Sequence, residues 1–229
     1  MTLADITLAR IDALIAEQGL LTHPFYQAWS AGTLTGNQLA GYARHYYQHV
    51  AAFPRYLALA YAGCDDLATR QMLLENLRDE EGGTVTHPEM WLRFADSLGN
   101  SRLDVFGAPQ MPETKEADAT FRAAMTAGTS TALGALYAYE AQIPAVAHTK
   151  IAGLDAHYPE LKANAGYFHV HESADVVHAG RVRELLAKRI INEADASEAY
   201  AGAEASILAT RRILDGICLE FGVEAPCMN

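Results

Sequence analysis

Residues 168–190 read FHVHESADVVHAGRVRELLAKRI, the most informative stretch of the chain. An α-helix turns once every 3.6 residues, so side chains at positions i, i+4 and i+7 share one face. His171, Asp175 and His178 stand at these positions, and Val182 continues the same face. The stretch therefore predicts a helix whose buried face carries three ionisable side chains.

The same spacing of apolar residues runs through most of the chain, whereas the alternation typical of β-strands is almost absent. The sequence therefore predicts an all-α bundle of about seven to eight helices. The expected helices cover 3–18, 22–31, 36–62, 65–97, 113–127, 129–152, 168–190 and 195–221. Gly82 and Gly83 are expected to loosen the fourth helix, and Pro54 to kink the third near Val50. No Pro/Gly/Ser-rich linker divides the chain, so residues 1–229 are expected to form one domain.

Composition limits the classes of partner. The 229 residues carry a formal net charge of −11, which opposes contact with nucleic-acid phosphates and anionic lipids. No stretch approaches the roughly 20 apolar residues that cross a bilayer, and the N-terminus lacks the pattern of a signal peptide. Cys64, Cys218 and Cys227 form no CxxC pair and are expected to be reduced, two in the core and one in the tail. We therefore expect a cytoplasmic protein with neither nucleic acid nor membrane as a partner.

Two further helices are expected to place ionisable side chains among apolar ones. In a continuous helix over 65–97, Glu80 and His87 share an otherwise largely apolar face with Trp91. In the helix over 129–152, Glu140 interrupts an apolar face in the run LYAYEAQIP. Four neighbours fall off these faces and are expected to face solvent or to lie behind the inward residues: Glu81, Glu89, His169 and Glu172.

The inward-facing acids and imidazoles point to metal. Burying an isolated charge costs several kcal/mol, so buried ionisable groups are usually paired or bound to a metal. Three carboxylates and three imidazoles on three helices suit two divalent first-row ions, either two irons or iron with manganese. Each histidine alone would more often be a hydrogen-bonded core residue, so the prediction depends on the whole set. The expected ligands are Glu80, His87, Glu140, His171, Asp175 and His178.

The third expected helix carries an aromatic face in the run YARHYYQHVAAFPRY. Tyr42, Tyr46, His49 and Phe53 share this face, and aromatic residues at helical spacing are most often plain core. Their hydroxyl and imidazole groups still require partners when buried, and a polar cavity would provide them.

In these motifs the chain resembles the CADD-like proteins (Chlamydia protein associating with death domains), heme-oxygenase-like di-metal oxidases related in fold to TenA and PqqC. The resemblance is nearly end to end and is carried by HPFYQAWSAGTLTGNQLAGYARHYYQHVAAFPRYL at 23–57, CDDLATRQMLLENLRDEEGG at 64–83, ALYAYEAQIP at 135–144 and HESADVVHA at 171–179. It implies a heme-oxygenase-like bundle, two metal ions at the six ligand positions named above, and a homodimer. The loop after residue 107 and the tail after Phe221 do not follow the family's pattern.

The resemblance also implies a function. CADD-like proteins are implicated in making p-aminobenzoate for folate synthesis, with dioxygen as co-substrate and an external reductant, from one of their own tyrosines. Tyr26 stands where the sacrificed tyrosine stands and Lys150 where the amino-group donor stands, while Tyr139 and Tyr167 resemble further tyrosines near the site. Without the resemblance, Lys150 would be interpreted as a surface residue at a helix end.

Two alternative functions stay open at this point. The metal site could act on an external small molecule, or the chain could be a metal-free TenA- or PqqC-like protein that binds a heterocycle in its cavity. The family name also records an association with death domains, but nothing in this sequence supports an interaction role.

Overall fold

The structure is a computed structural model and describes residues 1–224 of the chain. Within these residues every regular element is helical, which confirms the all-α prediction, but there are eleven α-helices rather than seven or eight. The elements are α1 Leu3–Gln18, η1 Leu20–Thr22, α2 Pro24–Ala31, α3 Gly36–Ala62, α4 Leu67–Glu81, α5 His87–Ser97, α6 Arg102–Phe106, α7 Pro112–Ala127, α8 Thr129–Glu140, α9 Ile143–His157, η2 Pro159–Asn164, α10 Gly166–Arg189 and α11 Glu193–Phe221.

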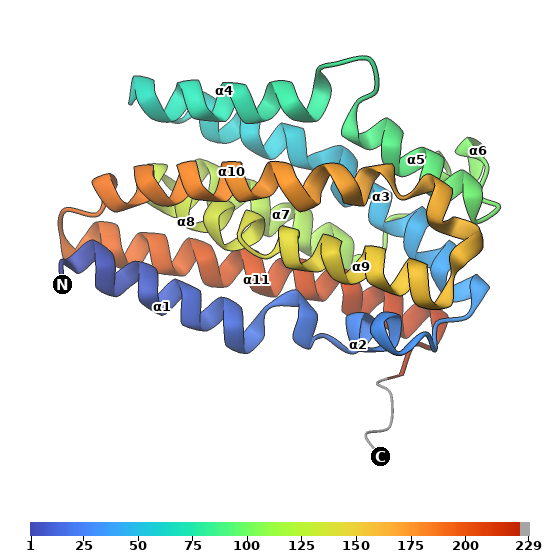
Figure 1. Cartoon of the computed structure of the whole chain (residues 1–229). Coiled ribbons are helices and arrows are strands. Elements are labelled where there is room, and N and C mark those ends of the chain that lie inside the picture. The colour runs from blue at the N-terminus through green and yellow to red at the C-terminus, as the bar shows by residue number, and fades with distance from the viewer. Residues whose placement is uncertain (225–229) are drawn as a thin grey trace.

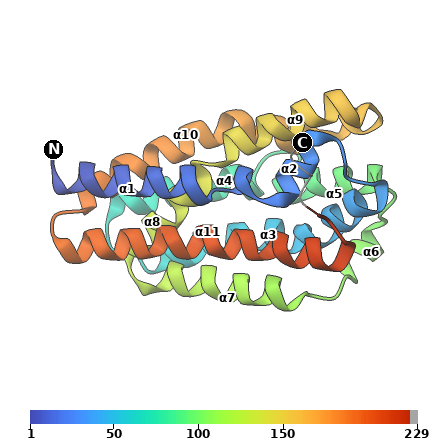
Figure 2. The same cartoon turned by 90° about the horizontal axis from the view of Figure 1, so that it is seen from below.

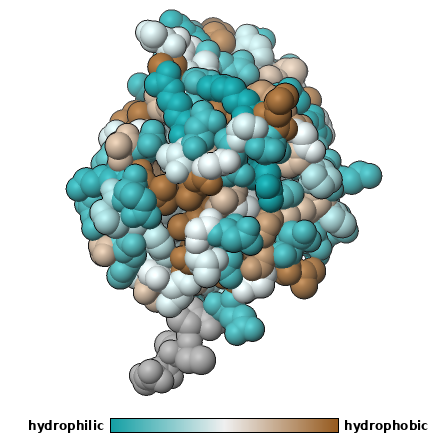
Figure 3. Space-filling view, turned by 90° about the vertical axis from the view of Figure 1, so that its right-hand side faces the viewer, coloured by the Kyte–Doolittle hydropathy of each residue, from teal (hydrophilic) through white to brown (hydrophobic). Residues whose placement is uncertain are grey.

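The long helices lie side by side and enclose α8 (Figure 1). Helix α11 packs against α8, α7 and α1, while α10 packs against α8 and α9. Seen from below, α7 and α10 lie on opposite sides of α11 (Figure 2). The end of the bundle that carries α5 and α6 has a mixed surface of hydrophilic and hydrophobic side chains (Figure 3). Among residues 1–224, no helix is both long and apolar enough to cross a membrane.

Helix α8 is buried because two glycines let α11 approach it closely. A Cβ atom added to Gly134 would lie 2.0 Å from the carbonyl oxygen of Ala199, and one added to Gly202 would lie 2.1 Å from that of Thr131. Only residues without a side chain fit such backbone contacts. The consequence for the site is that Glu140, at the end of α8, is 1% exposed.

The prediction of one helix over 65–97 is wrong. Gly82 and Gly83 do not merely loosen this helix, because α4 ends at Glu81 and α5 begins at His87. Gly83 has a φ of 78°, which is outside the helical range and favours glycine. The Thr86 hydroxyl then accepts the N–H of Glu89 and caps a new helix.

The prediction of one helix over 129–152 is also wrong, since α8 ends at Glu140 and α9 begins at Ile143. Pro144 lies in the first turn of α9 and has no N–H to donate back to Glu140, so α8 cannot continue through it. The Gln142 side chain occupies the junction, where it accepts the N–H of Leu20 at 2.7 Å. By contrast, α3 continues unbroken through Pro54.

The cysteines are free thiols where the structure describes them. Cys64 is buried and Cys218 is half-buried. The predicted tail thiol, Cys227, lies outside the described residues.

Candidate active site

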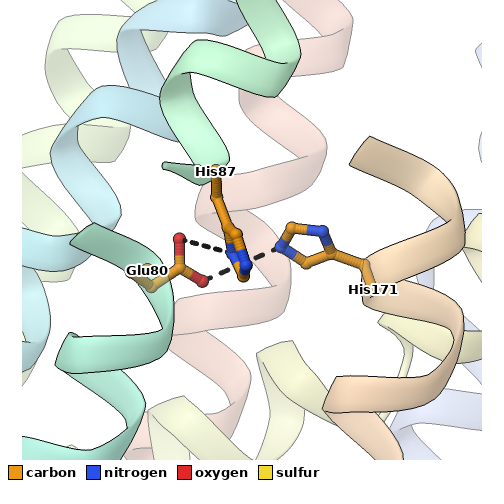
Figure 4. Close-up of side chains that lie close together, drawn as sticks. All are labelled: Glu80, His87 and His171. Atoms are coloured by element: carbon orange, nitrogen blue, oxygen red, sulfur yellow. Dashed lines mark ion pairs between the residues drawn. The ribbon is translucent and has the colours of Figure 1, made fainter. Parts of the chain in front are cut away.

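Three of the predicted ligands meet inside the bundle (Figure 4). Glu80 comes from the last turn of α4, His87 from the first residue of α5 and His171 from the second turn of α10. Glu80 Oε2 lies 3.1 Å from His87 Nδ1, and Glu80 Oε1 lies 3.7 Å from His171 Nε2. One ligand atom from each residue lies within 4.8 Å of the others, and all three side chains are buried. An oxygen and two nitrogens at this spacing suit a first-row metal ion.

The hydrogen bond on the far side of His171 orients it for such a role. Its Nδ1 donates to the backbone carbonyl of Tyr167 at 2.8 Å. This bond occupies Nδ1, so Nε2, the nitrogen that lies toward Glu80, is the atom available to a metal. Metal-binding histidines are usually held by a hydrogen bond of this kind.

The other three predicted ligands form a second buried group. His178 Nδ1 lies 3.4 Å from Asp175 Oδ1, while His178 Nε2 donates to Asp79 Oδ2 at 2.9 Å. Glu140 Oε1 accepts from Asn76 Nδ2 at 2.5 Å. Glu140 Oε2, Asp175 Oδ2 and His178 Nδ1 have no hydrogen-bond partner within residues 1–224. These three residues do not reach the 4.8 Å spacing of the first group.

The charges of the two groups call for cations. Burial disfavours charge on Glu80, but the His171 and His87 imidazoles outweigh it and lower the pKa of this carboxyl to about 2. Burial and the neighbouring Asp175 raise the pKa of Glu140 to about 8. A bound dication would favour the charged form of both carboxylates. The group of Glu80, His87 and His171 fits a metal site, and the partnerless atoms of the second group are donors of the same kind.

Lys150 is buried beside these groups, so its interpretation as a surface residue is wrong. The helix break at Gln142 places it in the middle of α9, where it is 4% exposed. Its Nζ donates to the Tyr42 hydroxyl at 2.5 Å. The Nζ atom also lies 4.8–5.7 Å from the centres of five aromatic rings, those of Tyr26, Tyr42, Tyr46, Trp91 and Phe168. Burial lowers the pKa of Lys150 to about 7.

Tyr26 is held in this aromatic cage by α2. Its ring centre lies 5.3 Å from Lys150 Nζ, and its side chain is 1% exposed. His23 caps the helix, since its Nδ1 accepts the N–H of Phe25 at 3.1 Å and its Nε2 donates to Asp215 at 3.0 Å. Burial raises the pKa of the Tyr26 phenol well above its usual value, which keeps it protonated.

A very small cavity connects the aromatic cage with the ligand His171. Its volume is about 20 Å³, enough for a water-sized molecule. The cavity is lined by all four residues that the resemblance places near the site: Tyr26, Tyr139, Lys150 and Tyr167. The rest of its lining consists of Tyr46, Ile143, Val146, Ala147, Phe168 and His171.

The aromatic face of α3 and the residues expected off the ligand faces lie as predicted. Tyr42, Tyr46, His49 and Phe53 are all buried. Glu81 and His169 are exposed, Glu89 pairs with Arg102 at 2.7 Å, and Glu172 pairs with His148 at 2.8 Å.

Asn76 and Asp79, which bond to Glu140 and His178, are not among the residues that the sequence predicts. Asn76 is 1% exposed and stands four residues before Glu80, on the same face of α4. A buried amide at that spacing from a predicted ligand was a usable signal. The sequence gives no comparable signal for Asp79, because its side chain is largely exposed and reaches His178 from another helix.

Comparison with known proteins agrees with the fold and gives the family. Residues 40–211 match the family described as iron-containing redox enzyme. The chain is 44% identical over 185 residues to the 4-aminobenzoate synthase of Chlamydia muridarum, covering 78% of this chain and 77% of that protein. It is 34% identical over 229 residues to the 4-aminobenzoate synthase of Nitrosomonas europaea, covering 95% and 93%.

A solved structure from Shewanella denitrificans, described as a domain of unknown function with a heme oxygenase-like fold, superposes with a TM-score of 0.73. The two sequences are 24% identical, and the match covers 95% of this chain and 91% of that one. The expected fold and the resemblance to p-aminobenzoate synthases are thus confirmed. The chain belongs to the iron-containing redox enzymes of heme-oxygenase-like fold, among relatives named 4-aminobenzoate synthase.

Proposed function

We propose that this protein makes p-aminobenzoate by an oxygen-dependent reaction at a two-metal centre, with its own Tyr26 as the precursor and Lys150 as the amino donor. The observation that carries the proposal is that Tyr26 and Lys150 line the same small cavity as the ligand His171. Tyr26 already presents an aromatic ring 5.3 Å from a buried amine. Relatives named 4-aminobenzoate synthase support the identity of the product.

The six predicted ligands would hold the two metals. Glu80, His87 and His171 would hold one ion, and the group of Glu140, Asp175 and His178 would hold the other. Two irons, or iron with manganese, are both compatible with these donors. When bound, the metals would supply the activation of dioxygen, with an external reductant.

Lys150 and its surroundings would supply the nitrogen. An amine whose pKa is about 7 is partly neutral at neutral pH, and only the neutral form is a nucleophile. The hydrogen bond to the Tyr42 hydroxyl holds Nζ in place, and the surrounding rings keep water away. In the product, the ring of Tyr26 would be retained and its Cβ would become the carboxyl carbon, which requires the Cα–Cβ bond to break with dioxygen as the oxidant. The neutral Lys150 amine would condense with the oxidised ring carbon Cζ and release its oxygen as water. After the imine double bond shifts to Cε, hydrolysis would break the Nζ–Cε bond and leave Cε as an aldehyde.

The test compares Tyr26→Phe with the parent protein. Reduced, iron-loaded protein is exposed to oxygen, and released p-aminobenzoate is measured by mass spectrometry. We expect Tyr26→Phe to release none while binding the same amount of metal, because Tyr26 lies outside the ligand set. Tyr137→Phe is the matched control, since Tyr137 is a buried tyrosine that does not line the cavity. Equal product from Tyr26→Phe and the parent would show that an external molecule is the substrate.

A further inference from the structure

A row of buried rings leads away from the cavity toward α7. Tyr139 lines the cavity, and its ring centre lies 5.4 Å from that of His49. His49 in turn lies 5.2 Å from Phe121 and 6.0 Å from Tyr56. Tyr56 and Phe121 are stacked at 4.9 Å with 9° between their planes. The row is therefore continuous from the candidate active site to Tyr56, and each of its members is buried.

At its outer end the row meets a carboxylate that reaches solvent. The Tyr56 hydroxyl donates to Asp118 Oδ1 at 2.9 Å, and Asp118 Oδ2 accepts from Arg122 Nε at 2.8 Å. The Asp118 side chain is 27% exposed, whereas Tyr56 is 1% exposed. A phenol bonded to a carboxylate loses an electron more readily than a free phenol, because its proton has an acceptor in place.

His49 in the middle of the row makes no hydrogen bond. Both of its ring nitrogens are buried without a partner within residues 1–224, an arrangement that costs stability. Burial lowers the pKa of His49 to about 4, so the ring stays neutral. A chain of hydrogen bonds is needed to pass protons, and His49 interrupts any such chain. The row is suited to passing electrons, and the proton of Tyr56 stays at Asp118.

We propose that Tyr56, with Asp118 as its proton acceptor, is a redox relay that passes single electrons from an external one-electron reductant to the metal centre. The relay rests on the proposed function, because it needs a metal centre that dioxygen has oxidised as the final electron acceptor. Tyr56 gives one electron through His49 and Tyr139 to that centre, and its hydroxyl proton moves to Asp118. The reductant returns one electron to the phenoxyl group, and Asp118 returns the proton. The net change is one electron moved inward, with no atom consumed.

The chain contains a matched control for this relay. Tyr137 donates to Asp12 Oδ1 at 2.5 Å, and Arg183 lies 3.2 Å from the same carboxylate. Tyr137 is 6% exposed, so it reproduces the buried phenol, the carboxylate and the arginine of the relay. Its ring is covered by the Arg183 guanidinium at 5.4 Å and takes no part in the row. Tyr137→Phe therefore removes an equivalent hydrogen bond without touching the row.

The test measures how fast the metal centre is reduced after dioxygen has oxidised it. The parent, Tyr56→Phe, Asp118→Asn and Tyr137→Phe, each loaded with iron(II), are mixed with oxygenated buffer that contains ascorbate as the one-electron reductant, and the metal signals are followed by freeze-quench electron paramagnetic resonance. We expect Tyr56→Phe and Asp118→Asn to slow reduction at least about tenfold, and Tyr137→Phe to leave the rate unchanged. Asp118→Asn keeps an oxygen that can accept the Tyr56 hydroxyl, so it covers the case in which Tyr56→Phe folds poorly. Equal rates for the parent and the folded variants would overturn the relay.

A spectroscopic test separates the relay from a merely structural hydrogen bond. Metal-free protein is photo-oxidised with a ruthenium tris(bipyridine) oxidant, and tyrosyl radicals are recorded by electron paramagnetic resonance. We expect a component of the signal that is absent in Tyr56→Phe and retained in Tyr137→Phe. Identical spectra would overturn the assignment of Tyr56. Neither test measures p-aminobenzoate, so a parent that makes no product would overturn the proposed function, while the two tests would still decide whether Tyr56 can pass electrons.

Discussion

Lys150 is the residue whose chemistry the fold changes most. Between pH 7 and 10.5 the unfolded chain holds a proton on this amine that the native protein releases. The unfolded state binds more protons in this window, so the contribution of Lys150 to stability rises with pH, by up to about 1.4 kcal/mol per pH unit.

Lys150→Met tests this directly. Methionine fills a similar volume without charge, so we expect Lys150→Met to remove the rise in stability and to abolish p-aminobenzoate formation. Urea unfolding at about pH 7.5 and about pH 9.5 gives the two free energies for each protein. Lys115→Met, on an exposed position of α7, is the control and should behave as the parent. A pH dependence in Lys150→Met equal to that of the parent would contradict the assignment.

Asn76 supports the second group of ligands through its bond to Glu140. Loss of such a supporting bond typically weakens metal binding by about 10- to 100-fold. We therefore expect the affinity of Asn76→Ala for the metal at the second ligand group to fall by about this factor. Metal content measured by plasma mass spectrometry after dialysis against a graded chelator checks this. Asn100→Ala is the control, because Asn100 is a buried amide bonded to the Ala40 carbonyl, outside both ligand groups. If the two variants retain metal equally well, Asn76 does not support metal binding.

At the scale of the elements, the close contact between α8 and α11 holds Glu140 in place. We expect Gly134→Ala to destabilise the protein by about 1–3 kcal/mol, because its Cβ would meet the Ala199 carbonyl at 2.0 Å. Gly180→Ala is the control, since this exposed glycine of α10 has open space around it and should gain up to about 1 kcal/mol. Thermal unfolding of both variants shows whether each substitution lowers or raises the stability of the protein. A neutral effect of Gly134→Ala would mean that the helices separate at little cost.

Helical spacing predicted the elements wherever one uninterrupted helix buries one face. Helix α10 is of this kind, so the shared face of His171, Asp175 and His178 was correctly predicted. Glu80 and His87 do face the same interior point, but through two helices and a non-helical connection at residues 82–86. The seven-residue spacing therefore predicted the orientation of both side chains correctly, although the continuous helix on which that prediction depended is wrong.

The position of Lys150 could not be predicted from spacing. Its orientation depends on the break between α8 and α9, which in turn depends on Pro144 and on a hydrogen bond from distant Leu20 to Gln142. The cavity volume was equally inaccessible, because it results from side chains of α2, α3, α8, α9 and α10 packing together. Periodicity within a helix carries no information on such contacts.

At the scale of the whole molecule, the proposed metals would tie together the four helices that carry the buried acids and imidazoles: α4, α5, α8 and α10. Ligands that bind only the folded state stabilise it, by about 2.7 kcal/mol when present at 100 times their dissociation constant. We expect the melting temperature of metal-free protein to rise when iron(II) or manganese(II) is added without oxygen, as measured by circular dichroism.

The control for metal stabilisation removes one carboxylate from each ligand group. A double variant, Glu80→Gln with Glu140→Gln, should fold but show no rise in melting temperature on adding either ion. If the parent is not stabilised by either ion, the two groups are not a metal site.

Tyr26 is part of the structural core, so if it is consumed as proposed, its loss would limit the life of each molecule. Removal of a fully enclosed ring of this size costs a protein about 3–5 kcal/mol, a large share of what keeps a domain folded. A molecule that had released its product would therefore carry a hole beneath α2 and become an easy target for proteolysis. The cell would then renew its supply of the vitamin precursor at the ribosome, one newly synthesised chain for each molecule of product.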